Sequence, residues 1–102
     1  NDLTFLFDIA HAKINNFNKN INFEKYKNEL PLKKAIQLHI CKYSIDKSLN
    51  QAYDAHNCPA ILDLLEVGDI ISKHPCIKYL TVEYYRDVEK LRISLDKVRE
   101  LI

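Results

Sequence analysis

A single glycine, Gly68, in a chain of 102 residues is the feature that most constrains the fold, and only three prolines accompany it. Sheets need many tight turns, and tight turns favour Gly, Pro and Asn. A chain with so little of this turn chemistry favours helices joined by short connections. We therefore expect an all-α fold, a compact bundle of five or six helices with a long C-terminal helix.

Apolar side chains recur at intervals of three and four residues, the spacing that gathers them on one face of a helix. The first helix is expected over about residues 2–17. Asparagines crowd the stretch that follows, and a short helix capped by Asn22 is expected over about residues 23–29. The inward side of the first helix would carry Leu3, Leu6, Phe7, Ala10, Ile14 and Phe17.

Three further helices are expected to begin at Pro31, Ser48 and Pro59. Proline suits the first turn of a helix, where its missing N–H is not needed. Ser48 and Gln51 have the spacing of a capping box, and Gly68 would close the third helix as a left-handed cap. The inward side of the helix opened by Pro31 would carry Leu32, Ala35, Ile36, His39, Ile40 and Tyr43.

The last and longest helix is expected over about residues 76–102. Its apolar positions from residue 84 onward alternate spacings of four and three, which is a heptad seam. The seam covers only about two and a half heptads, fewer than a persuasive coiled coil needs. We expect this helix to pack on its own domain, and the alternative is a helix that pairs with a second copy of the chain. The seam comprises Tyr84, Val88, Leu91, Leu95, Val98 and Ile102.

Composition indicates one globular domain over residues 1–102. Hydrophobic residues make up 47% of the chain and charged residues 28%, both ordinary for a folded protein. The chain lacks Met even at position 1, so we expect a fragment of a larger protein. Three cysteines are an odd number, which favours reduced thiols in an intracellular, cytoplasmic compartment. No apolar run approaches the roughly 18 residues of a transmembrane helix.

Every cysteine follows a histidine by two positions. Zinc accepts imidazole and thiolate ligands in a tetrahedron, so these pairs are candidate metal ligands. Pro59 follows the second pair and Pro75 lies within the third, and both prolines indicate turns, where side chains two apart can converge. The zinc hypothesis therefore uses His56, Cys58, His74 and Cys76. The alternative, which the unusual spacing of the ligands favours, is that the cysteines are small core residues.

The segment from residue 13 to residue 47 is rich in lysine. It contains eight lysines and only three acidic residues. Such a patch could bind an anionic lipid surface or phosphate. It contains no arginine, and the whole chain carries a net charge of only +1, so a nucleic-acid partner is not expected. The alternative is a solvated face. The candidate binding residues are Lys13, Lys19, Lys25, Tyr26, Lys27, Lys33, Lys34 and Lys42.

Signals for catalysis are weak. The chain contains no nucleophile elbow, phosphate loop, H-E-x-x-H or dinucleotide fingerprint. Cys58 or Cys76 could act as a nucleophile if its histidine lay within hydrogen-bond reach. Asp8 and His11 lie three apart and are expected to form a surface pair on one helix. We therefore expect a protein that is not an enzyme.

The segment from residue 48 to residue 68 combines apolar positions with a His-Asn pair and a closing glycine. These residues are Leu49, Ala52, His56, Asn57, Ile61, Leu64, Leu65 and Gly68. The pattern resembles one ankyrin unit. The family's repeat is a helix–turn–helix of about 33 residues, and no comparable set lies 33 residues before or after this one. The resemblance implies the end of a protein-binding solenoid and no catalysis.

The amphipathic segments, without a catalytic constellation, predict a non-catalytic binding or docking module within a larger intracellular protein. Its expected partner is another protein or domain. The alternatives are a domain that binds anionic lipid or phosphate through the lysine patch, and a zinc-stabilised helical domain or ankyrin-like segment.

Overall fold

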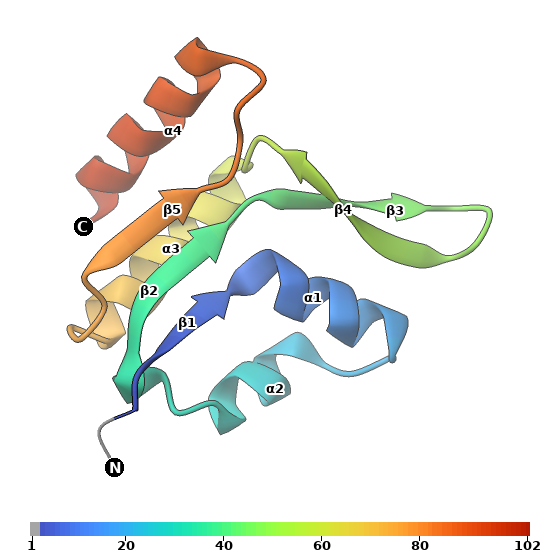
Figure 1. Ribbon diagram of the computed structural model, residues 1–102, viewed down its shortest axis with the longest axis horizontal. Helices are drawn as coiled ribbons and strands as arrows, with labels where there is room; N and C mark the ends of the chain where they lie inside the picture. Colours follow the sequence, from blue (N-terminus) through green and yellow to red (C-terminus); the bar gives the residue numbers. More distant parts are fainter. Residues whose placement is uncertain (1–2) are drawn as a thin grey trace.

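The computed structural model describes residues 3–102 and is an α/β fold, so the predicted all-α helical bundle is wrong. Over these residues, four α-helices combine with five strands in two sheets (Figure 1). A single 3-10 turn at Leu32–Lys34 precedes β2. In chain order the elements are β1 (Phe5–Asp8), α1 (Ile9–Asn18), α2 (Phe23–Glu29), β2 (Ala35–Ile40), β3 (Lys42–Asp46), β4 (Gln51–Asn57), α3 (Ile61–Lys73), β5 (Tyr79–Val82) and α4 (Val88–Leu101).

The main sheet has three parallel strands in the order β1-β2-β5, which is also their order along the chain. Phe7 pairs with Leu38, and Leu38 pairs with Leu80. Parallel neighbours need a long crossover between them, and here helices lie in both crossovers. β3 and β4 form a separate antiparallel hairpin that extends away from the carboxyl end of β2 (Figure 1).

One hydrophobic cluster joins the sheet to its helices. Phe7, Leu38 and Val82 supply one face of the three parallel strands, and α1, α3 and α4 all contribute to the same cluster. Because successive strand residues point to opposite faces, the alternate positions turn away from this cluster. The helical part of the cluster comprises Ile9, Ala12, Leu64, Val67, Ile70 and Val98.

Asparagine takes the place of glycine at two turns that need a left-handed backbone. Asn20 has φ 57° after α1, and Asn50 has φ 51° at the turn between β3 and β4. Asn adopts this region more readily than most residues that carry a Cβ. Parallel strands also avoid tight turns altogether. A low glycine count therefore does not exclude this sheet.

The N-terminal helix expected over residues 2–17 divides into β1 and α1, and residue 2 lies outside the described residues. The division falls at Asp8, whose side chain accepts a hydrogen bond from His11 N at 2.9 Å and caps α1. The next helix, α2, is confirmed. Its cap, Asn22, accepts from Lys25 N at 2.9 Å, as a side-chain N-cap should.

The helices expected from Pro31 and from Ser48 are strands. Leu38 shows why the first prediction failed, because it lies off the predicted helical stripe and yet is 0% exposed. Its burial fits a two-residue alternation in β2, with Gln37 and His39 on the other face. β4 replaces the first helix of the ankyrin-like segment, so the helix pair that the resemblance implies does not form.

The helix that follows Pro59 does form, as α3, but it continues through Gly68 to Lys73. Gly68 permits close packing of α4, since an added Cβ would lie 3.2 Å from Leu101 Cβ. The long helix expected over residues 76–102 is divided into β5 and α4, which breaks the heptad seam after Tyr84. Over residues 3–102, no helix combines the length and the apolar character needed to cross a membrane.

Candidate metal centre

Asp8, His39 and Glu83 meet at the carboxyl ends of the three parallel strands. Asp8 is the last residue of β1, His39 is the second-last of β2, and Glu83 directly follows β5. One ligand atom from each lies within 4.8 Å of the other two. His39 Nδ1 is 3.2 Å from Glu83 Oε1. This is the one group of three or more such ligand atoms among the residues that the structure describes.

The strand register explains why these side chains converge. Asp8 pairs with His39, and His39 pairs with Thr81, two residues before Glu83. The backbone N–H of Glu83 also donates to Ile40 O at 2.8 Å, which extends the pairing beyond the end of β5. The three residues alternate with core positions and so share the sheet face that turns away from the helices.

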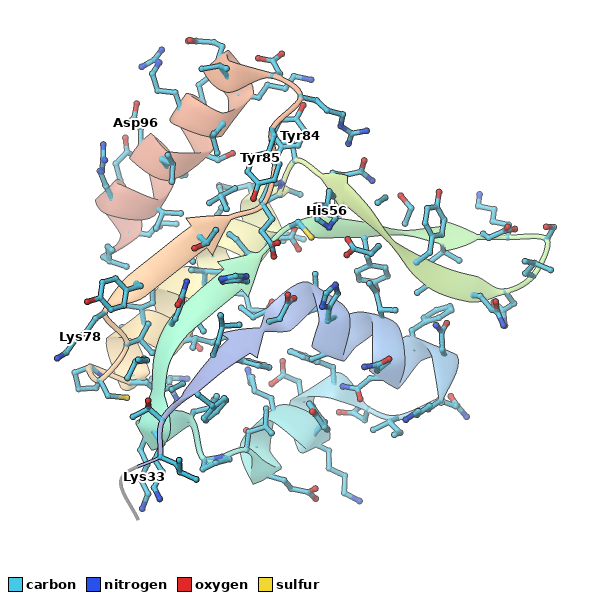
Figure 2. The ribbon with its side chains drawn as sticks, in the orientation of Figure 1. Lys33, His56, Lys78, Tyr84, Tyr85 and Asp96 are labelled. Atoms are coloured by element: carbon cyan, nitrogen blue, oxygen red, sulfur yellow. The ribbon has the colours of Figure 1, made fainter. Side chains whose placement is uncertain are left out.

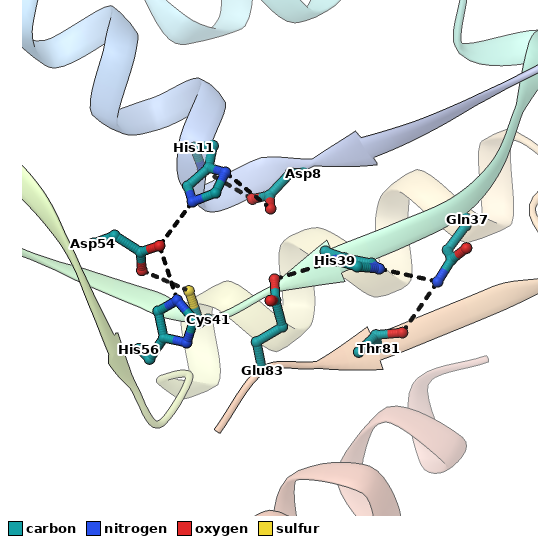
Figure 3. A network of polar contacts seen from close by, with 9 residues as sticks. All are labelled: Asp8, His11, Gln37, His39, Cys41, Asp54, His56, Thr81 and Glu83. Atoms are coloured by element: carbon teal, nitrogen blue, oxygen red, sulfur yellow. Dashed lines mark hydrogen bonds and ion pairs between the residues drawn. The ribbon is translucent and has the colours of Figure 1, made fainter. Parts of the chain in front are cut away.

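A second group, His11, Asp54 and His56, lies beside the first (Figure 3). Asp54 Oδ2 is 2.7 Å from His11 Nε2 and 2.8 Å from His56 Nε2. His11 Nδ1 is 3.2 Å from Asp8 Oδ2, so the ring of His11 joins the two groups. The hairpin thus brings β4 to the same edge of the parallel sheet.

His56 adopts a left-handed backbone conformation with φ 47°, which is uncommon for a residue that carries a Cβ. Its ring contacts Asp54, two residues earlier on β4. Arg86 supports the turn, since its guanidinium donates to His56 O at 3.2 Å and to Asn57 Oδ1 at 2.7 Å. Backbone strain of this kind is concentrated at functional sites.

The six side chains are partly shielded from solvent. Asp8, His39 and Glu83 are 19–23% exposed, whereas His56 and His11 at the outer end are 44% and 57% exposed. Figure 2 places His56 at the carboxyl end of the sheet beside Tyr84 and Tyr85, far from Lys33 and Lys78 at the amino end. A small ion or molecule can therefore reach the site from this edge.

The site perturbs three ionisable groups. The hydrogen bond to Asp54, together with the charges of Asp8, Asp54 and Glu83, raises the pKa of His11 above its usual 6.5 against the opposing effect of burial. Burial would raise the pKa of Asp54, but hydrogen bonds from His11 and His56 hold it below its usual 3.8. Burial, with the nearby carboxylates, raises the pKa of the Cys41 thiol to about 12.

Gln37 and Thr81 adjoin His39 on the side away from Glu83. Gln37 Nε2 lies 3.0 Å from His39 Nε2 and 3.2 Å from Thr81 Oγ1. Figure 3 shows the contact with Glu83 and the contact with Gln37 on opposite sides of the imidazole ring. Both ring nitrogens of His39 therefore have polar partners.

The predicted zinc ligands His56, Cys58, His74 and Cys76 are not brought together. Cys58 precedes α3 and His74 follows it, and a helix of 13 residues separates them by roughly 20 Å. Cys58 Sγ lies 3.6 Å from Ser94 Oγ, and Cys76 Sγ lies 3.4 Å from Leu32 O. His56 alone joins the site described above. His39, which also precedes a cysteine by two positions but was not among the predicted ligands, lies in the site as well.

The predicted lysine patch is spread over both ends of the sheet. Lys33 precedes β2 and Lys42 follows it, so a strand of six residues, about 20 Å long, separates them. Lys13 is paired with Glu66 at 2.6 Å, and Lys42 lies 4.0 Å from Asp63. Lys27 pairs with Glu24, Lys19 caps α1, Lys25 and Tyr26 lie on α2, and Lys34 closes the 3-10 turn. The lipid and docking hypotheses stay predictions.

The predicted metal ligands include none of Asp8, His39 and Glu83. Two local signals point to the site, namely Asp8 three residues before His11 and Asp54 two residues before His56. Neither signal is strong, because the other residues that complete the site come from strands that are distant in sequence.

No protein-family model matches this chain, and no curated protein matches it in sequence. The function must therefore be inferred from the geometry of the site.

Proposed function

We propose that Asp8, His39 and Glu83 bind a divalent transition-metal ion, and that the ion serves catalysis beside His11, Asp54 and His56. The observation that carries this proposal is the convergence of three ligand atoms within 4.8 Å from three adjacent parallel strands. Open α/β sheets bind their ligands at the carboxyl ends of the strands, where these residues lie.

The donor set fits such an ion. Two carboxylates and an imidazole suit zinc, manganese or ferrous iron, whereas a structural zinc site uses four ligands that are mostly thiolate and imidazole. Bonds of about 2.0–2.2 Å place neighbouring ligand atoms roughly 3–4 Å apart, so only small movements are needed. Three protein ligands leave coordination positions open, which is typical of catalytic sites.

The second group could handle protons beside the ion. A bound divalent ion polarises oxygen ligands and lowers the pKa of water. Asp54 orients the rings of His11 and His56, and imidazole is the side chain best suited to exchange protons near neutral pH. The more exposed position of both rings places them toward solvent and toward any substrate that reaches the edge.

The test measures binding of Zn²⁺, Mn²⁺ and, without oxygen, Fe²⁺ to metal-depleted protein by titration calorimetry. We expect one equivalent of at least one ion to bind. Asp8→Ala, His39→Ala and Glu83→Ala should each weaken binding at least about tenfold, which corresponds to about 1.4 kcal/mol. His74→Ala and Asp96→Ala are matched controls. His74 follows the end of α3 that is farther along the chain from His56, and Figure 2 shows Asp96 on α4, away from His56.

Two outcomes would contradict the proposal. One is that the unaltered chain binds none of the three ions. The other is that His39→Ala binds as tightly as the unaltered chain.

A further inference from the structure

We infer that Gln37 is a positioning residue that sets which ring nitrogen of His39 carries the proton, and so whether Nδ1 is free to bind the metal, an inference that rests on the proposed function. Gln37 and His39 are two residues apart on β2 and therefore share one face of the strand. Their side chains are in contact through Gln37 Nε2 and His39 Nε2 at 3.0 Å.

His39 presents its two nitrogens to different partners. Nδ1 lies 3.2 Å from Glu83 Oε1 and faces the cluster of ligand atoms, whereas Nε2 faces Gln37. With the amide of Gln37 donating to Nε2, the proton of a neutral ring must sit on Nδ1, where it can be donated to Glu83. This tautomer stabilises the metal-free site and blocks the lone pair that an ion would need.

Metal binding through Nδ1 requires the other tautomer, with its proton on Nε2 and an acceptor beside it. A metal-bound histidine usually donates its second ring N–H to such an acceptor. Rotation of the Gln37 amide by half a turn places Oε1 where Nε2 lies now, and Oε1 can accept this proton.

Thr81 makes both orientations of the amide acceptable. Its hydroxyl lies 3.2 Å from Gln37 Nε2 and accepts a hydrogen bond in the present orientation. A hydroxyl can also donate, so Thr81 can donate to Oε1 after the amide rotates. The amide of Gln37 and the tautomer of His39 thus change together, and the contacts of Gln37 with His39 and Thr81 are kept in both states.

Two variants of Gln37 test whether the acceptor oxygen of its amide matters for metal binding, and a third variant is a control. Gln37→Leu removes both polar ends, and Gln37→Glu keeps an acceptor but cannot donate when ionised. Gln51→Leu is the matched control, because Gln51 is exposed at the start of β4. Zn²⁺ affinity is measured by calorimetry, and the protonated nitrogen of His39 is identified from long-range ¹H–¹⁵N correlations in the full chain.

We expect Gln37→Leu to bind Zn²⁺ about 10–100-fold more weakly than the unaltered chain. Gln37→Glu should bind at least as tightly, and Gln51→Leu should bind equally. In the absence of metal, His39 should carry its proton on Nδ1 in the unaltered chain and on Nε2 in Gln37→Glu. The zinc-loaded chain should show Nδ1 bound and Nε2 protonated.

Two results would overturn the inference, namely equal Zn²⁺ affinity in folded Gln37→Leu, or the same metal-free tautomer in the unaltered chain and in Gln37→Glu. Failure of the unaltered chain to bind any ion would instead overturn the proposed function. The metal-free spectra would still decide whether Gln37 sets the tautomer. They also cover the case in which Gln37→Leu does not fold.

Discussion

Asp54 and His56 lie two residues apart on β4, and their side chains meet at 2.8 Å between Oδ2 and Nε2. Side chains two apart in a strand share one face, as those of Gln37 and His39 do on β2. At the end of β4 the backbone of His56 is in addition left-handed, with φ 47°. The end of the hairpin thus combines this contact with a strained backbone beside the parallel sheet.

The conformation of His56 predicts a specific order of stability among variants. His56→Val should destabilise the protein more than His56→Asn, by about 1–3 kcal/mol, because a β-branched residue resists positive φ whereas Asn tolerates it. Both variants remove the imidazole, so the difference isolates the backbone. Urea unfolding measures it, and equal stability of the two variants would count against the strained conformation.

Asn18 should hold the hairpin against α1. Its side chain donates to Ala52 O at 3.0 Å and accepts from Ala52 N at 2.7 Å. Asn18→Ala leaves both groups of Ala52 without a partner, and we expect a loss of about 1–3 kcal/mol. Amide exchange should quicken in β4 more than in β2. Asn28→Ala on α2 is the control, and unchanged exchange in β4 would contradict the prediction.

Leu38 should be essential to the core, because its side chain is fully buried at the centre of the parallel sheet. Leu38→Ala should lower the free energy of unfolding by about 2–5 kcal/mol, through lost burial and the cavity that remains. Leu62→Ala is the matched control. Leu62 is 75% exposed, so its truncation should change stability by less than about 0.5 kcal/mol. Similar losses for the two would exclude the β2 strand as described.

The pair of His11 and Asp54 should make the metal-free protein sensitive to pH in two windows. The raised pKa of His11 contributes stability below about pH 6.5, and this contribution disappears as pH rises through the raised value. The lowered pKa of Asp54 contributes stability above about pH 3.8, and this contribution disappears as pH falls through the lowered value.

Asp54→Asn should return the pKa of His11 toward 6.5, because it removes the carboxylate that contributes most to the shift. Proton NMR of the His11 ring, recorded against pH in the presence of a chelator, measures this change. Asp96→Asn, on α4, should leave the titration of His11 unaltered. A His11 pKa that stays raised in Asp54→Asn would show that another group causes the shift.

Cys41 should resist alkylation. Its thiol is buried and its pKa is raised to about 12, so almost none of the reactive thiolate is present near neutral pH. Cys58 and Cys76 are partly exposed and should react first. Mass spectrometry after timed treatment with iodoacetamide measures each site, and unfolding in urea should make the three rates similar. Fastest labelling at Cys41 in the folded protein would contradict this description.

Local sequence predicted α2 and its cap correctly, because a side-chain cap involves residues only three apart. It also located α3 after Pro59. It failed for β2, where Ile36 and Ile40 satisfy a helical spacing and a strand alternation equally well. Leu38 distinguishes the two, because it fits the alternation and not the helical stripe, and its burial between β1 and β5 depends on strands remote in sequence.

The site was less accessible to prediction than the fold. Asp8 and His11 were expected to form a surface pair on one helix, and they do contact each other at 3.2 Å, although Asp8 ends a strand. The role of Glu83 could not be inferred, since 44 residues separate it from His39. Its position depends on the pairing of β5 with β2.

The sequence by itself determined local features, namely the cap of α2 and the start of α3 after Pro59, because each depends on neighbours within a few residues. The tertiary structure alone decided that residues 35–40, 51–57 and 79–82 are strands and that Asp8, His39 and Glu83 meet. A parallel strand gains its hydrogen bonds only from partners across a long crossover, so no local pattern can specify which side chains its ends will bring together.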